Sequence, residues 1–187
     1  MECKWLPELM LYEDYESWDE YQDAIYGVFC DDFKKSYPIY DGKRVKIRYQ
    51  PIEYNREEGF YHVTCQDYQK DGERVPDLRR CERIKWVRKF IEHYDCNLDE
   101  CTECEGMKVW EEDYHNNKRV HILLEEEKYM VVIEKRKTYC LLITAFYIER
   151  EHTLQKKLKK YYQYKKDTAK GASLCETPSG TPSTSGR

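Results

Sequence analysis

Residues 107–148 read MKVWEEDYHNNKRVHILLEEEKYMVVIEKRKTYCLLITAFYI, and this stretch decides the fold. It contains four runs rich in β-branched, aromatic and aliphatic residues, at 107–114, 118–126, 128–135 and 139–148. The polar separations between the runs are short enough to be hairpin turns. The stretch therefore predicts a four-stranded antiparallel meander.

Three amphipathic helices are expected around this meander. Residues 17–35 carry apolar side chains at helical spacing, with Ser17 as the N-cap and Glu20 completing a capping box. Residues 76–94 repeat the apolar spacing among many arginines, and residues 149–167 form a lysine-rich helix directly after the last strand.

Two further strands are predicted before the second helix. KRVKIRY at 43–49 and FYHVTCQ at 60–66 both alternate, and alternation places His62 and Thr64 on one face of the second strand. The order of elements predicts one α+β domain over residues 1–167. In it, an N-terminal helix and a second helix pack on an antiparallel sheet with a C-terminal four-stranded meander, closed by a basic C-terminal helix.

The composition is that of a soluble globular domain. Of 187 residues, 40% are hydrophobic and 36% are charged, and no run approaches the about 18 apolar residues that a membrane helix needs. The first residues turn acidic at once and do not resemble a signal peptide, so a cytoplasmic protein without membrane contact is expected. Residues 168–187 are rich in Ser, Thr, Pro and Gly and are expected to be disordered.

Charge is distributed unevenly along the chain. Residues 1–35 hold ten acidic and three basic side chains, whereas residues 118–170 hold fourteen basic and seven acidic ones. Such an asymmetry is typical of a protein with a nucleic-acid-binding face at one end. Two solvated helix faces are the alternative interpretation.

The first candidate site combines a histidine, a threonine and two arginines. A metal-free ribonuclease needs a base for the 2′-hydroxyl, a cation for the phosphate and an acid for the leaving oxygen. His62 and Thr64 share a predicted strand face, and Arg79 and Arg80 begin the following helix. A purely structural His62 is the alternative.

Two other segments carry groups suited to RNA. On strand 139–148, Thr144 and Tyr147 lie on opposite faces unless a bulge near Phe146 changes the register, and an ordinary core strand is the alternative. The terminal helix interleaves tyrosines with lysines, and its lysines would face solvent or phosphates.

The nine cysteines raise the question of a metal site. His93, Cys96, Cys101 and Cys104 are four ligand-type side chains within twelve residues, and zinc prefers such nitrogen and sulfur ligands. The spacing from Cys96 to Cys101 is unusual for a zinc knuckle. Free cysteines in a polar connector are therefore expected, with no metal ion and no cofactor.

Six segments together resemble a family of small phage- and mobile-element-borne proteins assigned to the barnase–EndoU–colicin–RelE-like nuclease fold. The segments are LPELMLYEDY, FYHVT, VPDLRRCERIKWVRKFIE, KVWE, RVHILLEEEKYMVVIEKRKTYCLLITAFYI and EHTLQKKLKKYYQYKK, in that order. The resemblance covers most of residues 5–166. It implies a helix or two followed by a four-stranded antiparallel meander, in agreement with the prediction from the residues alone.

The resemblance also implies a function and a set of residues. Better-known relatives of the family are metal-independent endoribonucleases, many of them toxins, that cleave RNA by 2′-hydroxyl attack. The residues expected at the catalytic site are His62, Thr64, Arg80, Arg119, Thr144 and Tyr147. The residues expected to bind RNA are Arg79, Arg88, Lys156 and Lys160.

Two features of the resemblance leave alternatives open. The family's TAY element appears here as TAFY, so either Phe146 or Tyr147 occupies the tyrosine position. The expected partners are RNA and an acidic antitoxin or immunity protein docking on residues 118–166. The alternative function is a non-catalytic nucleic-acid- or protein-binding module of a phage or toxin–antitoxin system.

Overall fold

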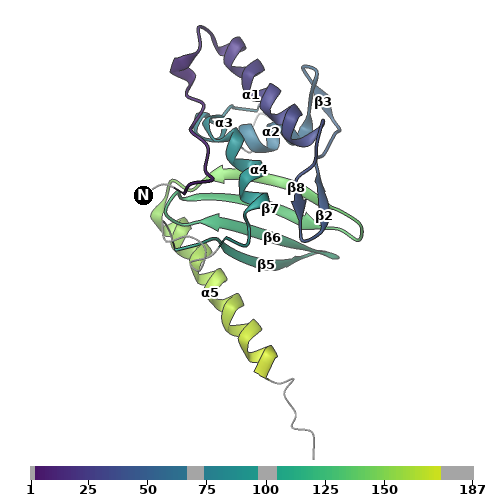
Figure 1. Ribbon diagram of the computed structural model, residues 1–187, viewed down its shortest axis with the longest axis vertical. Coiled ribbons are helices and arrows are strands. Elements are labelled where there is room, and N and C mark those ends of the chain that lie inside the picture. The colour runs from purple at the N-terminus through teal and green to yellow at the C-terminus, as the bar shows by residue number, and fades with distance from the viewer. Residues whose placement is uncertain (1–2, 67–73, 97–104, 174–187) are drawn as a thin grey trace, which may run out of the picture.

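The computed structural model describes residues 3–66, 74–96 and 105–173 (Figure 1). Its helices are η1 (Tyr12–Asp14), α1 (Trp18–Phe33), α2 (Glu58–Thr64), α3 (Leu78–Glu82), α4 (Ile84–Glu92) and α5 (Glu151–Ser173). Its strands are β1 (Ile39–Tyr40), β2 (Lys43–Lys46), β3 (Ile52–Glu53), β4 (Arg56–Glu57), β5 (Lys108–Tyr114), β6 (Asn117–Leu124), β7 (Tyr129–Lys135) and β8 (Cys140–Tyr147). The predicted α+β class is confirmed.

The predicted meander forms the main part of a six-stranded sheet with the strand order β1-β2-β8-β7-β6-β5. Strands β5 to β8 pair with their successive neighbours in antiparallel fashion, as predicted. Strand β2 joins the other side of β8 in parallel through Val45 and Lys46, and β1 pairs with β2. Strands β3 and β4 make a separate two-stranded sheet.

Each face of the sheet has its own apolar core. Helices α1 and α4 cover one face, where residues such as Phe29, Ile84 and Phe90 pack with Val120 and Val131. Helix α5 begins against the opposite face and then extends beyond the sheet (Figure 1). Both faces of the central strands are therefore buried, so β6 and β7 read as continuous apolar runs rather than as alternating ones.

Helix α1 confirms the predicted 17–35 helix and its cap. The Ser17 hydroxyl accepts a hydrogen bond from the backbone N–H of Glu20 at 3.2 Å. The Glu20 carboxylate accepts from the backbone N–H of Glu16 at 2.9 Å, one residue earlier than the capping box predicts. The predicted apolar stripe is buried at Tyr21 and at the positions spaced four residues after it.

Segment 60–66 was predicted to be a strand, and this prediction is wrong because residues Glu58–Thr64 form helix α2. The buried positions include Gly59, Phe60 and Val63, a spacing that suits a helix lying on a core. Gly59 lies so close to the preceding segment that a Cβ there would come within 2.9 Å of the Ile47 Cβ. Burial therefore overrides the strand preference of the aromatic and β-branched residues.

Three other boundaries differ from the prediction. Strand β2 ends at Lys46, because Val45 and Lys46 are its last residues with a partner on β8. The predicted helix 76–94 is two helices that meet at Arg83, and Asp77 caps the first of them. Helix α5 continues to Ser173, past the predicted end at 167, and the rest of the predicted tail lies outside the described residues.

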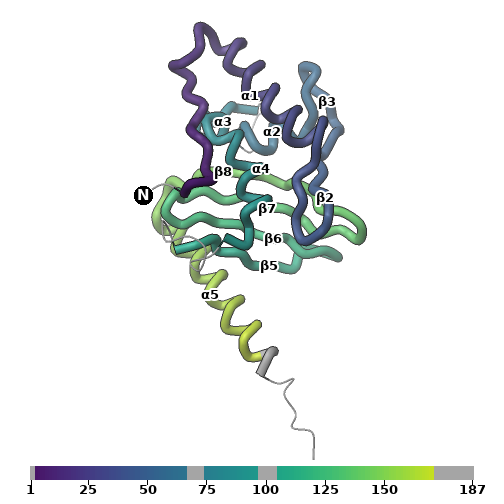
Figure 2. The backbone as a smooth tube through the Cα atoms, in the orientation of Figure 1, coloured from purple at the N-terminus to yellow at the C-terminus, as the bar shows by residue number. Residues whose placement is uncertain are grey.

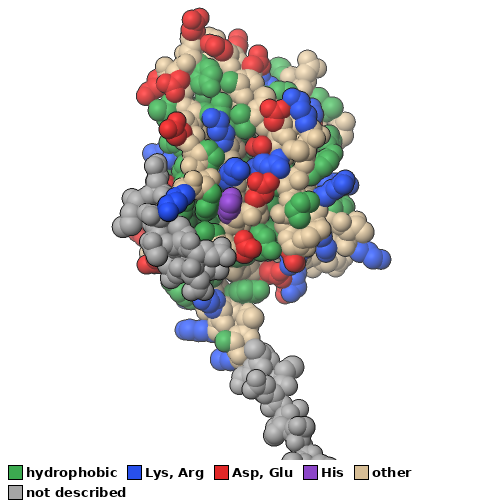
Figure 3. Space-filling view, in the orientation of Figure 1, with side chains coloured by type: hydrophobic (Ala, Val, Ile, Leu, Met, Phe, Trp, Pro, Cys, Tyr) green, Lys and Arg blue, Asp and Glu red, His purple; other side chains and the backbone are tan. Residues whose placement is uncertain are grey.

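The N-terminal segment runs along α3 and α4 before the chain turns into α1 (Figure 2). The Trp86 indole N–H donates to the Pro7 carbonyl at 2.7 Å, and the Met10 backbone N–H donates to the Glu82 carbonyl at 2.9 Å. Acidic side chains gather at the end of the molecule that carries η1 and the start of α1 (Figure 3). This segment is thus part of the folded domain.

Candidate functional site

Three of the predicted site residues meet where α2 and α3 lie against β8. The Thr144 hydroxyl donates to the His62 carbonyl at 2.8 Å. The Arg80 Nη1 lies 3.3 Å from the Thr144 Oγ1 and 3.4 Å from the same His62 carbonyl. One hydrogen-bonded centre therefore brings together His62, Arg80 and Thr144, which are far apart in the sequence.

The His62 imidazole points to a different set of partners. Its Nε2 lies 2.8 Å from the Glu58 Oε1, one helical turn earlier on α2, and the Glu58 carboxylate also pairs with Arg74. Glu58 is only 5% exposed, and a buried carboxylate needs partners such as the His62 imidazole and the Arg74 guanidinium. With a proton on Nε2, the Nδ1 of His62 is an acceptor, a tautomer inferred from the bonding pattern.

Thr64 was expected beside His62, and the helical backbone separates them. The Thr64 side chain is buried, with 2% of the residue exposed, and its hydroxyl donates to the Phe60 carbonyl at 2.8 Å. This is the usual bond of a helical threonine to the carbonyl one turn before it. The Thr64 hydroxyl is therefore used within α2, and the prediction that Thr64 and His62 share a strand face is wrong.

Arginines from α3 surround the end of β8. Arg79, Arg80 and the following Arg83 each pair with a different carboxylate, at 3.0, 3.4 and 3.3 Å. The guanidinium carbons of Arg79 and Arg83 both lie 5.0 Å from the centre of the Tyr147 ring. The sequence interpretation overlooked Arg83, although it shares the spacing of one helical turn with Arg79.

The register of β8 decides how its hydroxyl groups are presented. Leu142 pairs with Ile133 and Thr144 pairs with Val132, so Ile143 is the extra residue of a β-bulge. Because the bulge precedes Thr144, the regular alternation from Thr144 to Tyr147 keeps these two residues on opposite faces. Tyr147 therefore contacts Arg79 and Arg83, whereas Thr144 contacts Arg80.

Arg119 was expected in the same site, and the structure places it elsewhere. It lies on β6 opposite Glu134, and its Nε is 3.4 Å from the Glu134 Oε2. Its guanidinium carbon also lies 3.4 Å from the centre of the Tyr114 ring. Thr144 pairs with Val132, on a different row of the sheet, so Arg119 lies apart from the centre that Arg80 and Thr144 form.

Arg88 was expected to bind RNA, but it joins α4 to the end of α1. Its Nη1 donates to the Ser36 hydroxyl at 2.6 Å and to the Asp32 carbonyl at 3.2 Å, and its Nε pairs with Glu92 at 2.7 Å. Burial raises the pKa of the neighbouring Asp32 carboxyl to about 6. With its donors used in this way, Arg88 is a structural residue.

The lysines of α5 are placed as predicted, on the surface. Lys156 is exposed, and Lys160 is more than half exposed while its Nζ lies 2.6 Å from the Glu112 Oε2. Within the described part of the chain, Lys160 is the one lysine of α5 that has a carboxylate partner. Figure 3 shows Lys and Arg side chains on the part of α5 that extends from the domain.

A polar cluster beneath α5 was not predicted. The His121 ring stacks on Trp110 with their centres 4.8 Å apart, and its Nε2 lies 3.4 Å from the Glu112 Oε1. Burial lowers the pKa of His121 to about 4, and desolvation also lowers the pKa of Lys157 nearby. The signal in the sequence was the continuous apolar run of β6, which indicates burial on both faces.

Of the four ligand-type side chains in the cysteine-rich segment, the structure describes His93 and Cys96. His93 stacks on Trp5 with ring centres 4.7 Å apart, and burial lowers its pKa. Cys101 and Cys104 lie outside the described residues. Among residues 3–66, 74–96 and 105–173, no three or more Cys, His, Asp or Glu side chains gather in a metal-binding arrangement.

Comparisons of the chain with protein-family models, with curated protein sequences and with solved structures found no match. In the part of the chain that the structure describes, no helix combines the length and the apolar character needed to cross a membrane. The functional proposal below therefore depends on the geometry of the site and on the resemblance of the six sequence segments.

Proposed function

We propose that the protein is a metal-independent endoribonuclease whose site lies at the junction of α2, α3 and β8. The observation that carries this proposal is that Arg80 and Thr144 both bond to the backbone carbonyl of His62, the residue whose imidazole pairs with Glu58. These three residues come from three of the segments that resemble the nuclease family.

In this proposal His62 is the general base. The Glu58 carboxylate holds the Nε2–H of His62 at 2.8 Å, which leaves Nδ1 to accept the proton of the RNA 2′-hydroxyl. Glu58 would also stabilise the imidazolium formed, as the third member of a catalytic triad does. The 2′-oxygen then bonds to phosphorus, the bond from phosphorus to the 5′-oxygen breaks, and a 2′,3′-cyclic phosphate and a 5′-hydroxyl result.

The remaining groups stabilise charge and position the substrate. Arg80 supplies a fixed cation for the negative charge that develops on the phosphate oxygens, with Thr144 holding the guanidinium in place at 3.3 Å. Tyr147 stacks on a base or donates the proton to the leaving oxygen. Arg79, which is half exposed, and the α5 lysines bind the RNA backbone, so binding weakens strongly with salt.

The test is cleavage of total RNA by the purified full chain in excess chelator. We expect cleavage by the native protein and a loss of about 10²–10⁴-fold in the His62→Ala variant. His115→Ala is the matched control, because His115 lies in the turn between β5 and β6 and should leave the rate unchanged. Equal cleavage by the native and His62→Ala proteins, or none by either, would contradict the mechanism.

The second candidate is a non-catalytic module that binds nucleic acid or an acidic protein. The observation in its favour is the set of exposed lysines on α5, which needs no catalytic centre to bind a polyanion. Salt-dependent RNA binding without cleavage would favour this candidate. Growth arrest on expression, relieved by His62→Ala, would instead favour a toxin neutralised by an acidic antitoxin on residues 118–166.

A further inference from the structure

We propose that a groove between α4, β5 and α5 binds an unpaired base of a single-stranded nucleic acid, with the flanking phosphates on the lysines of α5. This inference rests on the proposed function and names the form of its RNA, single-stranded rather than duplex. The groove is separate from the residues proposed for catalysis.

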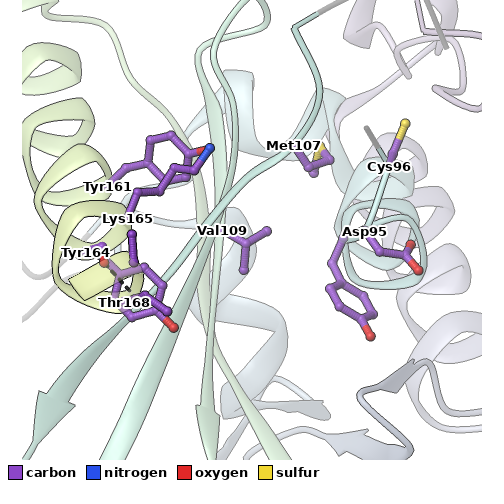
Figure 4. Close-up of a pocket in the computed structure, with 10 residues that line it drawn as sticks. Asp95, Cys96, Met107, Val109, Tyr161, Tyr164, Lys165 and Thr168 are labelled. Carbon is purple, nitrogen blue, oxygen red and sulfur yellow. Dashed lines mark hydrogen bonds between the residues drawn. The ribbon is translucent and has the colours of Figure 1, made fainter. Parts of the chain in front are cut away.

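The groove has two walls and a floor and holds about 480 Å³ (Figure 4). Tyr161, Tyr164 and Lys165 of α5 form one wall, Val109 lies on the floor, and Met107 stands toward the other wall. Strand β5 is the last strand of the sheet. Its outer backbone groups therefore face the groove and not another strand of this sheet. The shape therefore arises where helices on opposite faces of the sheet pass its edge.

The lining suits a flat aromatic ring. Most of the lining surface is apolar, and Tyr164 supplies an aromatic ring on which a base can stack. The other rings of the lining are held in place: Tyr161 lies 6.3 Å from Trp110, and Tyr94 on the far wall lies 4.4 Å from Tyr40, between ring centres. A pocket of this size also falls in the range that small ligands occupy.

The lysines of α5 favour a polyanion on that side of the groove, whereas the opposite wall carries the acidic side chain of Asp95. Helix α5 carries seven lysines and two acidic residues between 151 and 170, and these lysines continue along the helix from the groove. The Lys165 ammonium lies over the Tyr161 ring, with its Nζ 5.7 Å from the ring centre, so a base that stacks on Tyr164 has this cation next to it. Stacking rings next to a line of cations are the features with which proteins hold single strands without sequence preference.

The experiment measures binding of a short single-stranded oligonucleotide with 2′-O-methyl riboses, which cannot undergo 2′-hydroxyl attack. Tyr164→Ala removes a stacking ring, and Val109→Trp fills the floor, so the two variants disturb the groove in opposite ways. We expect each to weaken binding about tenfold. Tyr54→Ala is the control, because Tyr54 is exposed in the turn between β3 and β4 and does not line the groove.

Charge and base contributions are separated with an abasic oligonucleotide of equal length. We expect it to bind the native protein more weakly and to bind the native and Tyr164→Ala proteins equally. Thermal unfolding shows which variants keep the fold. If only one of Val109→Trp and Tyr164→Ala folds, the binding of the folded one still tests the groove. Unchanged binding by the folded groove variants would overturn the proposal, and so would tighter binding of a duplex. The same holds if an acidic peptide displaces the oligonucleotide and Tyr164→Ala weakens binding of the peptide as much as binding of the oligonucleotide.

Failure of the groove and failure of the ribonuclease can be told apart. Tyr164-dependent binding without RNA cleavage removes the catalytic proposal and keeps the groove. His62-dependent cleavage with oligonucleotide binding that ignores Tyr164 and Val109 removes the groove and keeps the catalytic proposal.

Discussion

The arginine-rich α3 and α4 and the lysine-rich α5 are both strongly basic in sequence, but their cations are used differently. On α3 and α4 the arginines bond to carboxylates, carbonyls and hydroxyls of the domain, as Arg80 and Arg88 do. On α5 most lysines are exposed, and within residues 3–66, 74–96 and 105–173 Lys160 is the one with an ion pair.

The difference follows from the chemistry of the two side chains. A guanidinium carries five donors in a planar group and can bridge several elements, whereas an ammonium is a strongly hydrated point charge on a flexible stem. Arg80 therefore joins α3 to α2 and β8, and Arg88 joins α4 to the end of α1, whereas the exposed lysines of α5 are available for a polyanion. A count of basic residues cannot separate these uses.

The largest expected effect is on stability, at Arg80. The Arg80→Ala substitution leaves Asp77, the Thr144 hydroxyl and the His62 carbonyl without their common partner. We expect a loss of about 3–4 kcal/mol in the free energy of unfolding, measured by urea denaturation. Arg79→Ala is the control, because the half-exposed pair of Arg79 with Glu149 should contribute about 1 kcal/mol or less.

The contrast between arginines bonded within the domain and exposed cations would be contradicted if Arg80→Ala and Arg79→Ala lowered the free energy of unfolding by the same amount. In that case the bonds of Arg80 would be no more important to the fold than an exposed ion pair. A large loss at Arg80 alone would sharpen the distinction between arginines that build the domain and cations that face solvent.

The next effect is a pH dependence of stability from the cluster beneath α5. Burial lowers the pKa of His121 from 6.5 to about 4, so between these values the unfolded chain binds more protons than the folded one. The free energy of unfolding should therefore fall by about 2–3 kcal/mol as the pH falls through this window. The groups facing His121 are Glu112, Lys157, Lys160 and Arg119.

The His121→Phe variant tests this cause, since it keeps an aromatic ring on Trp110 and removes the titrating group. Urea denaturation between pH 7 and pH 4.5 should show a shallower loss of stability in the variant. The lowered pKa of Glu112 acts in the same direction at the acid end and remains in both proteins. Parallel pH profiles would assign the dependence to other groups.

The smallest effect on stability is expected at the lysines of α5. A triple variant with Lys156→Gln, Lys159→Gln and Lys166→Gln should change the free energy of unfolding by less than about 0.5 kcal/mol, because all three side chains are exposed. Its binding to single-stranded RNA should show a salt dependence shallower by about 0.7 per lysine on logarithmic axes. A large loss of stability, or an unchanged salt dependence, would remove the contrast with α3.

The sequence was most informative where each element carries its own signal. The four strands from β5 to β8 each have an apolar run bounded by a short polar turn, so their antiparallel order could be predicted. Helix α1 has a regular apolar spacing and a capping serine. These signals are local, and packing elsewhere in the chain does not reverse them.

The site was harder to predict because its geometry depends on distant partners. The helix at Glu58–Thr64 is favoured by contact of Gly59 with Ile47 and by burial on the core, neither of which is visible within FYHVT. Arg80 and Arg119 look equivalent as basic residues, and only the fold shows that one meets Thr144 and the other meets Glu134. The His121 cluster escaped notice because its partners come from β5 and α5.

The arrangement at the two sides of the sheet has a consequence for how the chain behaves at high concentration. A long, uncovered edge strand can recruit a strand from another molecule. Strand β5 is an edge strand of the sheet, and α5 packs over Trp110 of this strand on one face. Proteolytic removal of α5 would uncover Trp110 and the outer strand together, and the shortened protein should aggregate through its sheet.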